Sequence, residues 1–457
     1  MVGMSSLREF LAECEARGET IHITAPLSVN LEIAAAMKIL DEGQVLIFED
    51  VREYPGRLIV ANLCATKARI SHALKIEEAM LHRKILDALE NPIAPEPDGG
   101  RGEYTAKSTF NLQEIPALRH FENDGGRYIT GGVVACRGAD GKINASIHRL
   151  MVVDGRHLAI RIVPRHLFKM CRDAEATGES RLPIAILIGL HPAVMVAAAA
   201  PAPYGVNEFA VANALLNGEL SLIPTERYGI PVPSKTEIIL EGEILLREYV
   251  DEGPFVDLTG TYDIVRKQPL IEVSDIYLRE AFIYQAILPS GSEHRILMGL
   301  PYEARIREAV ARAVPEVRDV YLTPGGCGWF NARISLRKQA EGDPKNAIMA
   351  AFGAHPSLKS VVILDEDVEV SDDAMVEWAL TTRAQPSEDI IIIEGARGSS
   401  LDPSADQEKL LTSKIGIDAT CPMDKPIEKF KRAQVKVTEQ VRRALGDVPH
   451  KRRGGHA

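Results

Sequence analysis

The sequence has few cysteines, and no two of them have the spacing of a metal or redox motif. Its 457 residues include six cysteines, none in a Cys-x-x-Cys pair. Six is too few for a disulfide scaffold, and a structural zinc site or a thioredoxin-type motif is not expected without such a pair. The opening MVGMSSLREFLAE also lacks the basic and then apolar pattern of a signal peptide. We therefore expect a reducing, cytoplasmic setting.

An excess of positive charge is also missing. Lys and Arg number 53 and Asp and Glu 64, so the net charge is −11. A field of this sign repels phosphate backbones and argues against nucleic acid as the main partner. Hydrophobic residues make up 46% and charged residues 26%, which is the balance of a globular chain rather than a disordered or fibrous one. At about 150 residues per domain, the length predicts two large domains or three smaller ones.

A membrane-spanning run is not expected either. Residues 183–200 contain no formal charge, but His191 and Pro192 lie in the middle of this run and its second half is mostly alanine. Proline is well tolerated at a helix start, and a span needs about 20 apolar residues. The pattern therefore predicts a buried strand at 184–188, a turn at Gly189 and a helix that begins at Pro192.

Three regions differ in their pattern of helices and strands. Residues 1–105 alternate short strands with helices, the first helix capped by Ser5 or Ser6, and end in a polar, Pro- and Gly-rich stretch near residue 100. Residues 106–301 contain closely spaced strands and two helices, which is typical of a barrel or a strongly bent sheet. Residues 302–457 alternate again. The fold class predicted is therefore α/β (α+β).

Two segments of the third region predict assembly. The strand DIIIIEG at 389–395 is fully apolar at its centre, like strands buried in a parallel sheet. The segment 429–446 is amphipathic and is predicted to form a last helix. An apolar face without a partner in its own chain favours a homo-oligomer, a dimer or a larger assembly.

One predicted strand has an unusual arginine. In the strand at 143–149, Arg149 falls on the same face as the apolar residues Ala145 and Ile147. An unpaired buried charge is costly, so Arg149 needs an anionic partner. Either an anionic ligand or a structural ion pair would satisfy it.

Three further residues form a possible ligand set. His166 follows a proline at a predicted helix start, where histidine is commonly a surface or capping residue, and Glu241 lies in an apolar strand where a carboxylate is unexpected. With Asn144 they would supply hard oxygen and nitrogen ligands, which suit Mn²⁺ or Mg²⁺ better than structural zinc. Their spacing alone does not show that they meet.

Five stretches in order resemble the UbiD family of reversible decarboxylases, which use prenylated FMN. They are NASIHR at 144–149, VPRH at 163–166, EIILEG at 237–242, VSDIYLRE at 273–280 and TSKIGIDATCP at 412–422. The resemblance covers residues 105 to 425. It implies an N-terminal α/β domain (1–105), a flavin-reductase-like split β-barrel that binds prenylated FMN (106–301), and a C-terminal α/β domain with a terminal oligomerisation helix (302–457).

The resemblance also implies roles for single residues. Asn144, His166 and Glu241 match the ligands of a Mn²⁺ ion that bridges to the flavin phosphate, with K⁺ as an additional candidate ion. Arg149, Glu280 and Asp275 match the catalytic acid–Arg–acid trio, in which Arg149 grips a carboxylate and Glu280 delivers a proton, while Glu293 competes for the acid role. The implied cofactor-binding residues are Asn144, Ala145, Ser146, Ile147, His148, Arg149, Arg165, His166, Glu241 and Lys414, and Arg165 stands where some members have Gln.

The members of two residue pairs, Asn144 with Arg149 and Asp275 with Glu280, are five positions apart. On a regular strand such residues point to opposite faces, so a bulge or strand end must intervene if both reach one pocket.

The expected function is a non-oxidative decarboxylase of an α,β-unsaturated carboxylic acid, supplied with prenylated FMN by a flavin prenyltransferase. The compact length and the IGIDATCPMDKP ending are most similar to archaeal members, which implies trans-anhydromevalonate 5-phosphate as substrate and a dimer or hexamer as assembly. An aromatic acid such as a 4-hydroxybenzoate derivative is the alternative. Two other classes remain open: a non-catalytic flavin-binding assembly protein, and a metal hydrolase that needs no flavin.

Overall fold

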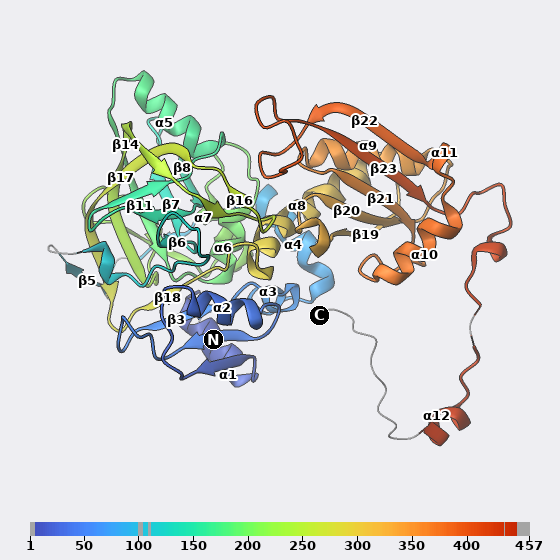
Figure 1. Ribbon diagram of the computed structural model, residues 1–457, viewed down its shortest axis with the longest axis horizontal. Helices are drawn as coiled ribbons and strands as arrows, with labels where there is room; N and C mark the ends of the chain where they lie inside the picture. Colours follow the sequence, from blue (N-terminus) through green and yellow to red (C-terminus); the bar gives the residue numbers. More distant parts are fainter. Residues whose placement is uncertain (1–4, 99–103, 108–110, 434, 446–457) are drawn as a thin grey trace. The chain divides into compact units, whose positions relative to one another are not determined.

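The computed structural model describes residues 5–98, 104–107, 111–433 and 435–445 (Figure 1). The chain divides into two compact units, residues 1–304 and 305–457. The predicted domain boundary near residue 100 falls largely on positions 99–103, outside the described residues.

The N-terminal region of the first unit forms a small mixed sheet. Helix α1 (Leu7–Ala16) begins with the predicted serine cap: Ser6 accepts the Glu9 N–H, and the Glu9 carboxylate accepts the Ser6 N–H in return. Its apolar face is buried at Leu7, Phe10, Leu11 and Cys14, as its spacing predicts. The sheet has the order β1-β2-β3-β18. Its strands are β1 (Thr20–Ile23), β2 (Val45–Phe48), β3 (Leu58–Ala61) and β18 (Ile283–Gln285).

Strand pairing joins this small sheet to the rest of the unit. Strand β18 comes from the end of the second predicted domain and pairs in parallel with β3, so the two regions share one sheet. The helices of this region are α2 (Glu32–Ile39), α3 (Lys67–Ala73) and α4 (Leu81–Glu90).

A nine-stranded sheet forms the centre of the first unit (Figure 1). Its order is β6-β9-β10-β17-β14-β11-β7-β8, and β5 (Tyr104–Lys107) pairs with β17. The alternation of apolar residues along these strands buries two large clusters, one on each face. The other strands are β6 (Tyr128–Ile129), β7 (Val133–Arg137), β8 (Ile143–Ile147), β9 (Leu150–Val152), β10 (His157–Ile160), β11 (Arg181–Ile188), β14 (Ile238–Glu252) and β17 (Arg266–Arg279).

Three helices and a hairpin complete this unit's core. Helix α6 (Pro192–Ala199) begins at the predicted proline, and Gly189 makes the predicted turn with a φ of +80°. Helices α5 (His166–Ala176) and α7 (Glu208–Leu215) are the two that the sequence predicts. A short hairpin, β15 (Phe255–Val256) with β16 (Tyr262–Asp263), connects β14 to β17. No helix among the described residues is long and apolar enough to cross a membrane.

A break in one predicted strand changes the direction of its side chains. The sequence predicts a strand that continues through 143–149, but the structure has β8 up to Ile147 and β9 from Leu150, with His148 and Arg149 between them. The strand end required by the five-residue spacing of Asn144 and Arg149 is therefore present.

The second unit contains a five-stranded sheet in the order β19-β20-β21-β23-β22, with α9 (Asp343–Ala354) and α10 (Asp373–Arg383) on its two faces (Figure 1). The predicted burial of 389–395 in a parallel sheet is wrong. Strand β22 (Ile390–Arg397) is an edge strand antiparallel to β23, and Ile392 is 65% exposed. The strands are β19 (Val317–Leu322), β20 (Asn331–Leu336), β21 (Ser360–Asp365), β22 and β23 (Leu411–Ala419).

Two helices at the limits of the second unit differ from the prediction. Helix α8 (Ser292–Ala313) starts ten residues before 302, the predicted start of the third region, and continues through Pro301. The predicted last helix over 429–446 is shorter: α12 covers Glu439–Leu445, while Val435 is 89% exposed in an irregular segment.

Candidate functional site

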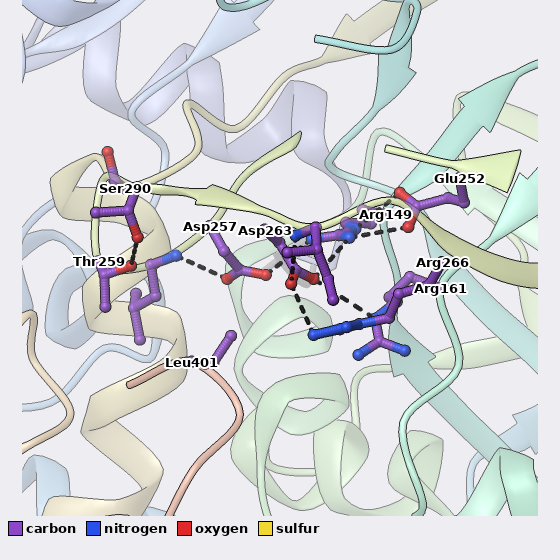
Figure 2. Close-up of polar contacts among 12 residues, drawn as sticks. Arg149, Arg161, Glu252, Asp257, Thr259, Asp263, Arg266, Ser290 and Leu401 are labelled. Carbon is purple, nitrogen blue, oxygen red and sulfur yellow. Dashed lines mark hydrogen bonds and ion pairs between the residues drawn. The ribbon is translucent and has the colours of Figure 1, made fainter. Parts of the chain in front are cut away.

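The predicted anionic partner of Arg149 is a set of three carboxylates. Arg149 donates from Nε and Nη2 to the two oxygens of Glu252, at 2.9 and 2.8 Å. Its Nη1 donates to Asp257 at 2.9 Å, and Nη2 also donates to Asp263 at 3.1 Å. Figure 2 shows the guanidinium between Glu252 on one side and Asp257 on the other. We call these four residues the Arg149 cluster.

The chain's local structure explains how the acids reach Arg149. Glu252 is the last residue of β14, Asp257 follows β15, and Asp263 ends β16. The β15–β16 hairpin therefore folds all three acids toward the break between β8 and β9, where Arg149 lies.

Burial and charge act in opposite directions on Arg149. Its side chain is 9% exposed, and desolvation by itself lowers the pKa of an arginine. The carboxylates of Glu252, Asp257 and Asp263 more than offset this, so the pKa of Arg149 is raised. The ring of Phe255 lies 5.0 Å from the guanidinium carbon, and the Tyr128 hydroxyl donates to Glu252 at 3.2 Å. Arg149 is thus held charged and in one orientation.

Glu252 and Asp257 have different environments. Glu252 is fully buried and held by a two-pronged ion pair, which is the stronger and more directional arrangement. Asp257 is 22% exposed and has a single bond to Arg149. Of the two, Asp257 is the one in contact with solvent.

Two more arginines surround Asp263. Arg266 donates from Nη2 to Asp263 at 2.9 Å, and its buried Nε has no partner among the described residues. Arg161 approaches the same carboxylate only to 3.9 Å, which is too far for a hydrogen bond. Burial and the positive charges of Arg149 and Arg266 lower the pKa of Arg161. This side of the cluster (Figure 2) therefore has donors available to an anion.

A second group of polar residues lies near the other end of β8. Asn144 is buried, and its Nδ2 donates to Glu208 Oε1 at 3.1 Å. The Ala145 N–H donates to Glu208 Oε2 at 2.9 Å, and His166 Nδ1 lies 3.9 Å from Glu208 Oε1. Glu208 is the first residue of α7, where a helix N-terminus stabilises a carboxylate.

These residues provide the ligand types expected for a hard divalent cation. The amide of Asn144 and the imidazole of His166 both lie against the carboxylate of Glu208. Oxygen and nitrogen ligands of these types suit Mn²⁺ or Mg²⁺. Nowhere among the described residues do three or more His, Cys, Asp or Glu side chains form a group that could hold a metal, and this set has two such residues together with an amide. The residues at this end of β8 therefore fit the ion that the sequence implied, with Glu208 in the set.

Glu241, the carboxylate expected in the metal site, has other partners. It is fully buried and accepts the backbone N–H groups of Arg227 and Tyr228, both at 3.0 Å. Because its oxygens hold a loop, Glu241 is not brought to Asn144 and His166. Its cross-strand neighbour Asp275 forms an ion pair with Arg227 rather than with Arg149.

Glu280 also lies apart from the Arg149 cluster. It is exposed, follows the end of β17, and its carbonyl accepts a hydrogen bond from Arg8 at 2.9 Å. Glu252 pairs with Arg266 at the opposite end of the same strand. At about 3.3 Å per residue, the two ends of β17 are roughly 40 Å apart along the strand. The expected meeting of Arg149 with Glu280 and Asp275 is therefore absent, and Glu252, Asp257 and Asp263 take their place.

The remaining expected cofactor residues are placed as follows. Ser146 donates to Asn144 Oδ1 at 3.3 Å and lies 3.0 Å from His148 Nε2, while Ile147 is half-buried at the end of β8. Burial lowers the pKa of His148 to about 4. Arg165 is exposed at the start of α5. These side chains border both polar groups of β8.

Lys414 belongs to β23 in the second unit. It is 5% exposed, and its Nζ donates to the carbonyls of Pro356 and Leu358 at 2.6 and 2.5 Å. Burial lowers the pKa of Lys414 to about 8.

Glu293, the competing acid, is fully enclosed at the start of α8. It accepts the N–H groups of Asn62 and Cys64, at 2.9 and 2.8 Å, and burial raises its pKa to about 7. Both carboxylate oxygens are used by the backbone of the first unit, which gives Glu293 a structural contact in place of one with Arg149.

Three of the four site residues that were not predicted have a recognisable pattern around them in the sequence. Glu208 stands in the apolar helix 207–216, and a carboxylate there is as unexpected as Glu241 is in its strand. Glu252 and Asp257 flank Gly253 and Pro254, a turn pair that ends a long strand. Asp263 has no such signal, because one acid in a polar loop is ordinary.

Family models match most of the chain. The N-terminal domain of the 3-octaprenyl-4-hydroxybenzoate carboxy-lyase family matches residues 11–89, its Rift-related domain 99–292 and its C-terminal domain 295–419.

Individual proteins agree with these matches. An anhydromevalonate phosphate decarboxylase of Methanothermobacter thermautotrophicus is 48% identical over 415 residues, covering 91% of this chain and 96% of the relative. The UbiD-class enzyme HmfF of Pelotomaculum thermopropionicum, in complex with FMN, superposes with a TM-score of 0.91 at 37% identity, over 94% of this chain and 97% of HmfF. An evolved dimeric HmfF in complex with prenylated FMN gives 0.87 at 34% identity, over 95% and 99%. The chain therefore belongs to the UbiD family of carboxy-lyases.

Proposed function

We propose that this chain decarboxylates a phosphorylated α,β-unsaturated acid, trans-anhydromevalonate 5-phosphate, with prenylated FMN and Mn²⁺. The observation that carries the proposal is the Arg149 cluster: one oriented guanidinium with a buried acid, Glu252, and a partly exposed acid, Asp257. A decarboxylase needs a donor for the carboxylate that leaves and an acid for the carbon that remains.

The donors of Arg149 indicate how the carboxylate is bound. A guanidinium has five N–H donors, and the three acids use four of them. A substrate carboxylate needs two parallel donors, so it must displace one acid. Asp257 has one bond and the greatest exposure of the three, so it is the acid displaced from Nη1.

Proton delivery follows from that displacement. The C–C bond breaks, CO₂ leaves, and the electron pair of that bond stays on the carbon. Prenylated FMN, when bound, supplies the electron sink that side chains lack. The released Asp257 takes up a proton from solvent and delivers it to the carbon as general acid. Glu252 keeps the Arg149 guanidinium charged and oriented throughout.

The cofactor and its ion would be held at the other end of β8. Asn144, His166 and Glu208 are the proposed ligands of the cation, and Ser146, His148 and Arg165 adjoin them. The HmfF structures with FMN and prenylated FMN support a flavin in this fold. A flavin prenyltransferase would supply it.

The choice of substrate rests on the archaeal relatives. The M. thermautotrophicus relative is named anhydromevalonate phosphate decarboxylase. Arg161 and Arg266 lie beside Asp263, so three guanidinium groups balance the three carboxylates of the cluster and the site does not repel an anionic substrate.

The test is co-expression with a flavin prenyltransferase, followed by CO₂ release from trans-anhydromevalonate 5-phosphate and from 4-hydroxybenzoate. We expect CO₂ release from trans-anhydromevalonate 5-phosphate, and we expect this release to require both the flavin and the prenyltransferase. Release from the aromatic acid alone would show that an aromatic acid is the substrate. Activity of the flavin-free protein with Mn²⁺ would indicate a hydrolase instead. No turnover of any acid by the loaded protein would favour a flavin-binding assembly role.

A further inference from the structure

The loop 119–126 contacts the segment that carries the three acids of the Arg149 cluster. It precedes β6 and contributes no group to the chemistry above. We call it the Asp124 loop. Besides residues 29–31 and Met151, it contacts the segment 252–263, which carries all three acids of the cluster.

Asp124 fixes the shape of this loop. Its side chain is buried, and Oδ2 accepts the N–H groups of His120 and Phe121, at 3.1 and 2.9 Å. The backbone N–H of Val256, in β15, lies close enough to favour the charged carboxylate, although the buried Oδ1 has no hydrogen-bond partner among the described residues. The carboxylate thus interacts with the loop and with the residue directly before Asp257.

Gly125 places the loop backbone against the chain between Glu252 and Phe255. Its N–H donates to the Pro254 carbonyl at 2.8 Å. A Cβ at position 125 would lie 2.2 Å from the Gly253 carbonyl oxygen, a distance that real Cβ atoms do not reach. Only glycine permits this approach.

Three other contacts reach both strands of the hairpin. The Asn123 N–H donates to the Tyr262 hydroxyl at 3.1 Å, next to Asp263. The rings of Phe121 and Tyr262 are 6.4 Å apart. The ring of His120 packs edge-on against Phe255, at 6.2 Å between centroids, and Phe255 lies under Arg149.

We propose that Asp124 and Gly125 are positioning residues that hold Glu252 and Asp257 in the places needed to orient Arg149 and deliver the proton. Each of the three acids lies within two residues of a position that the loop contacts: Glu252 beside Gly253–Pro254, Asp257 beside Val256, and Asp263 beside Tyr262. Because Asp257 sits on a short hairpin with one bond to Arg149, its position depends on this support. The expected effect on turnover rests on the proposed function, whereas the expected effect on the order of residues 252–263 does not.

The first test compares Asp124→Asn with Asp154→Asn. Asp154 accepts two backbone N–H groups in the same way, at 2.7 and 2.9 Å, in an exposed turn with no contact to the cluster. In the flavin-loaded enzyme we expect Asp124→Asn to lower kcat about 10- to 100-fold, with KM within about 3-fold, because small misplacements of a reacting group have effects of this size. Asp154→Asn should leave both within about 2-fold. Equal effects of the two changes, or a loss confined to KM, would overturn the proposal.

The second test needs no activity. Amide hydrogen exchange of the full flavin-free chain should show faster exchange over 252–263 in Asp124→Asn and Gly125→Ala. It should be unchanged there in Gly353→Ala, where an added Cβ meets open space. Unchanged protection of 252–263 in both loop variants would refute the positioning role whether or not the protein decarboxylates anything. An inactive wild-type enzyme with the expected exchange pattern would refute only the proposed function.

Discussion

The energetic coupling of Arg149 with its acids distinguishes Glu252 from Glu280 as its partner. The perturbation is a double-mutant cycle of Arg149→Met with Glu252→Gln, beside a matched cycle with Glu280→Gln. Glu252 is fully buried and forms two charge-assisted hydrogen bonds with Arg149, whereas Glu280 is exposed.

The magnitude follows from these contacts. Removing one partner of a buried ion pair costs about 3–5 kcal/mol. Asp257 and Asp263 still neutralise Arg149 in Glu252→Gln, so we expect a coupling of about 2–3 kcal/mol in the free energy of unfolding. For Glu280 we expect coupling within about 0.5 kcal/mol, as for residues without shared partners.

The assay is urea denaturation of the flavin-free chain followed by circular dichroism, with the slope of each transition compared between variants. A coupling below about 1 kcal/mol with Glu252, or an equal one with Glu280, would refute the geometry of the cluster.

Three further predictions concern the metal, a buried histidine and the competing acid. Glu208→Gln should lower Mn²⁺ and flavin content, measured by elemental analysis and absorbance, whereas Glu241→Gln should retain both; the reverse result would restore Glu241 as the ligand. His191 is fully buried, its Nδ1 accepts the Ala193 N–H, and burial lowers its pKa to about 3. The unfolded chain therefore binds more protons below about pH 6.5, and stability should fall as pH drops from 7 to 5. The melting temperature of His191→Asn should fall less over that range, and an equal fall would exclude His191 as a cause. Glu293→Gln should retain turnover within a few-fold when CO₂ release is measured, because its contacts are with backbone; a loss comparable to that of Asp257→Asn would make Glu293 the acid.

Local patterns in the sequence predicted many of the elements correctly. The serine cap of α1, the turn at Gly189 and the start of α6 depend on residues within a few positions of each other, and the structure has all three. The exposed edge strand β22 was misread because four isoleucines give the same pattern in a buried strand and at a sheet edge. Only pairing with other strands, which the sequence does not show, separates the two.

The site required knowledge of distant contacts. Arg149 could be recognised as needing an anion, because its place on an apolar face is a local property. Its partners come from more than 100 positions further along the chain, and the choice among the carboxylates there depends on how the β15–β16 hairpin turns. Glu208 and Glu241 have the same local signal, and the packing of α7 against β8 decides between them.

The central claim is that an acid of the Arg149 cluster delivers the proton. The direct measurement is deuterium incorporation into the product, or exchange into the substrate, by the flavin-loaded enzyme in heavy water. We predict that Asp257→Asn abolishes incorporation while the spectrum of the bound flavin persists, and that Glu280→Gln incorporates deuterium at nearly the wild-type rate. Incorporation that survives Asp257→Asn but is lost in Glu280→Gln would contradict the account.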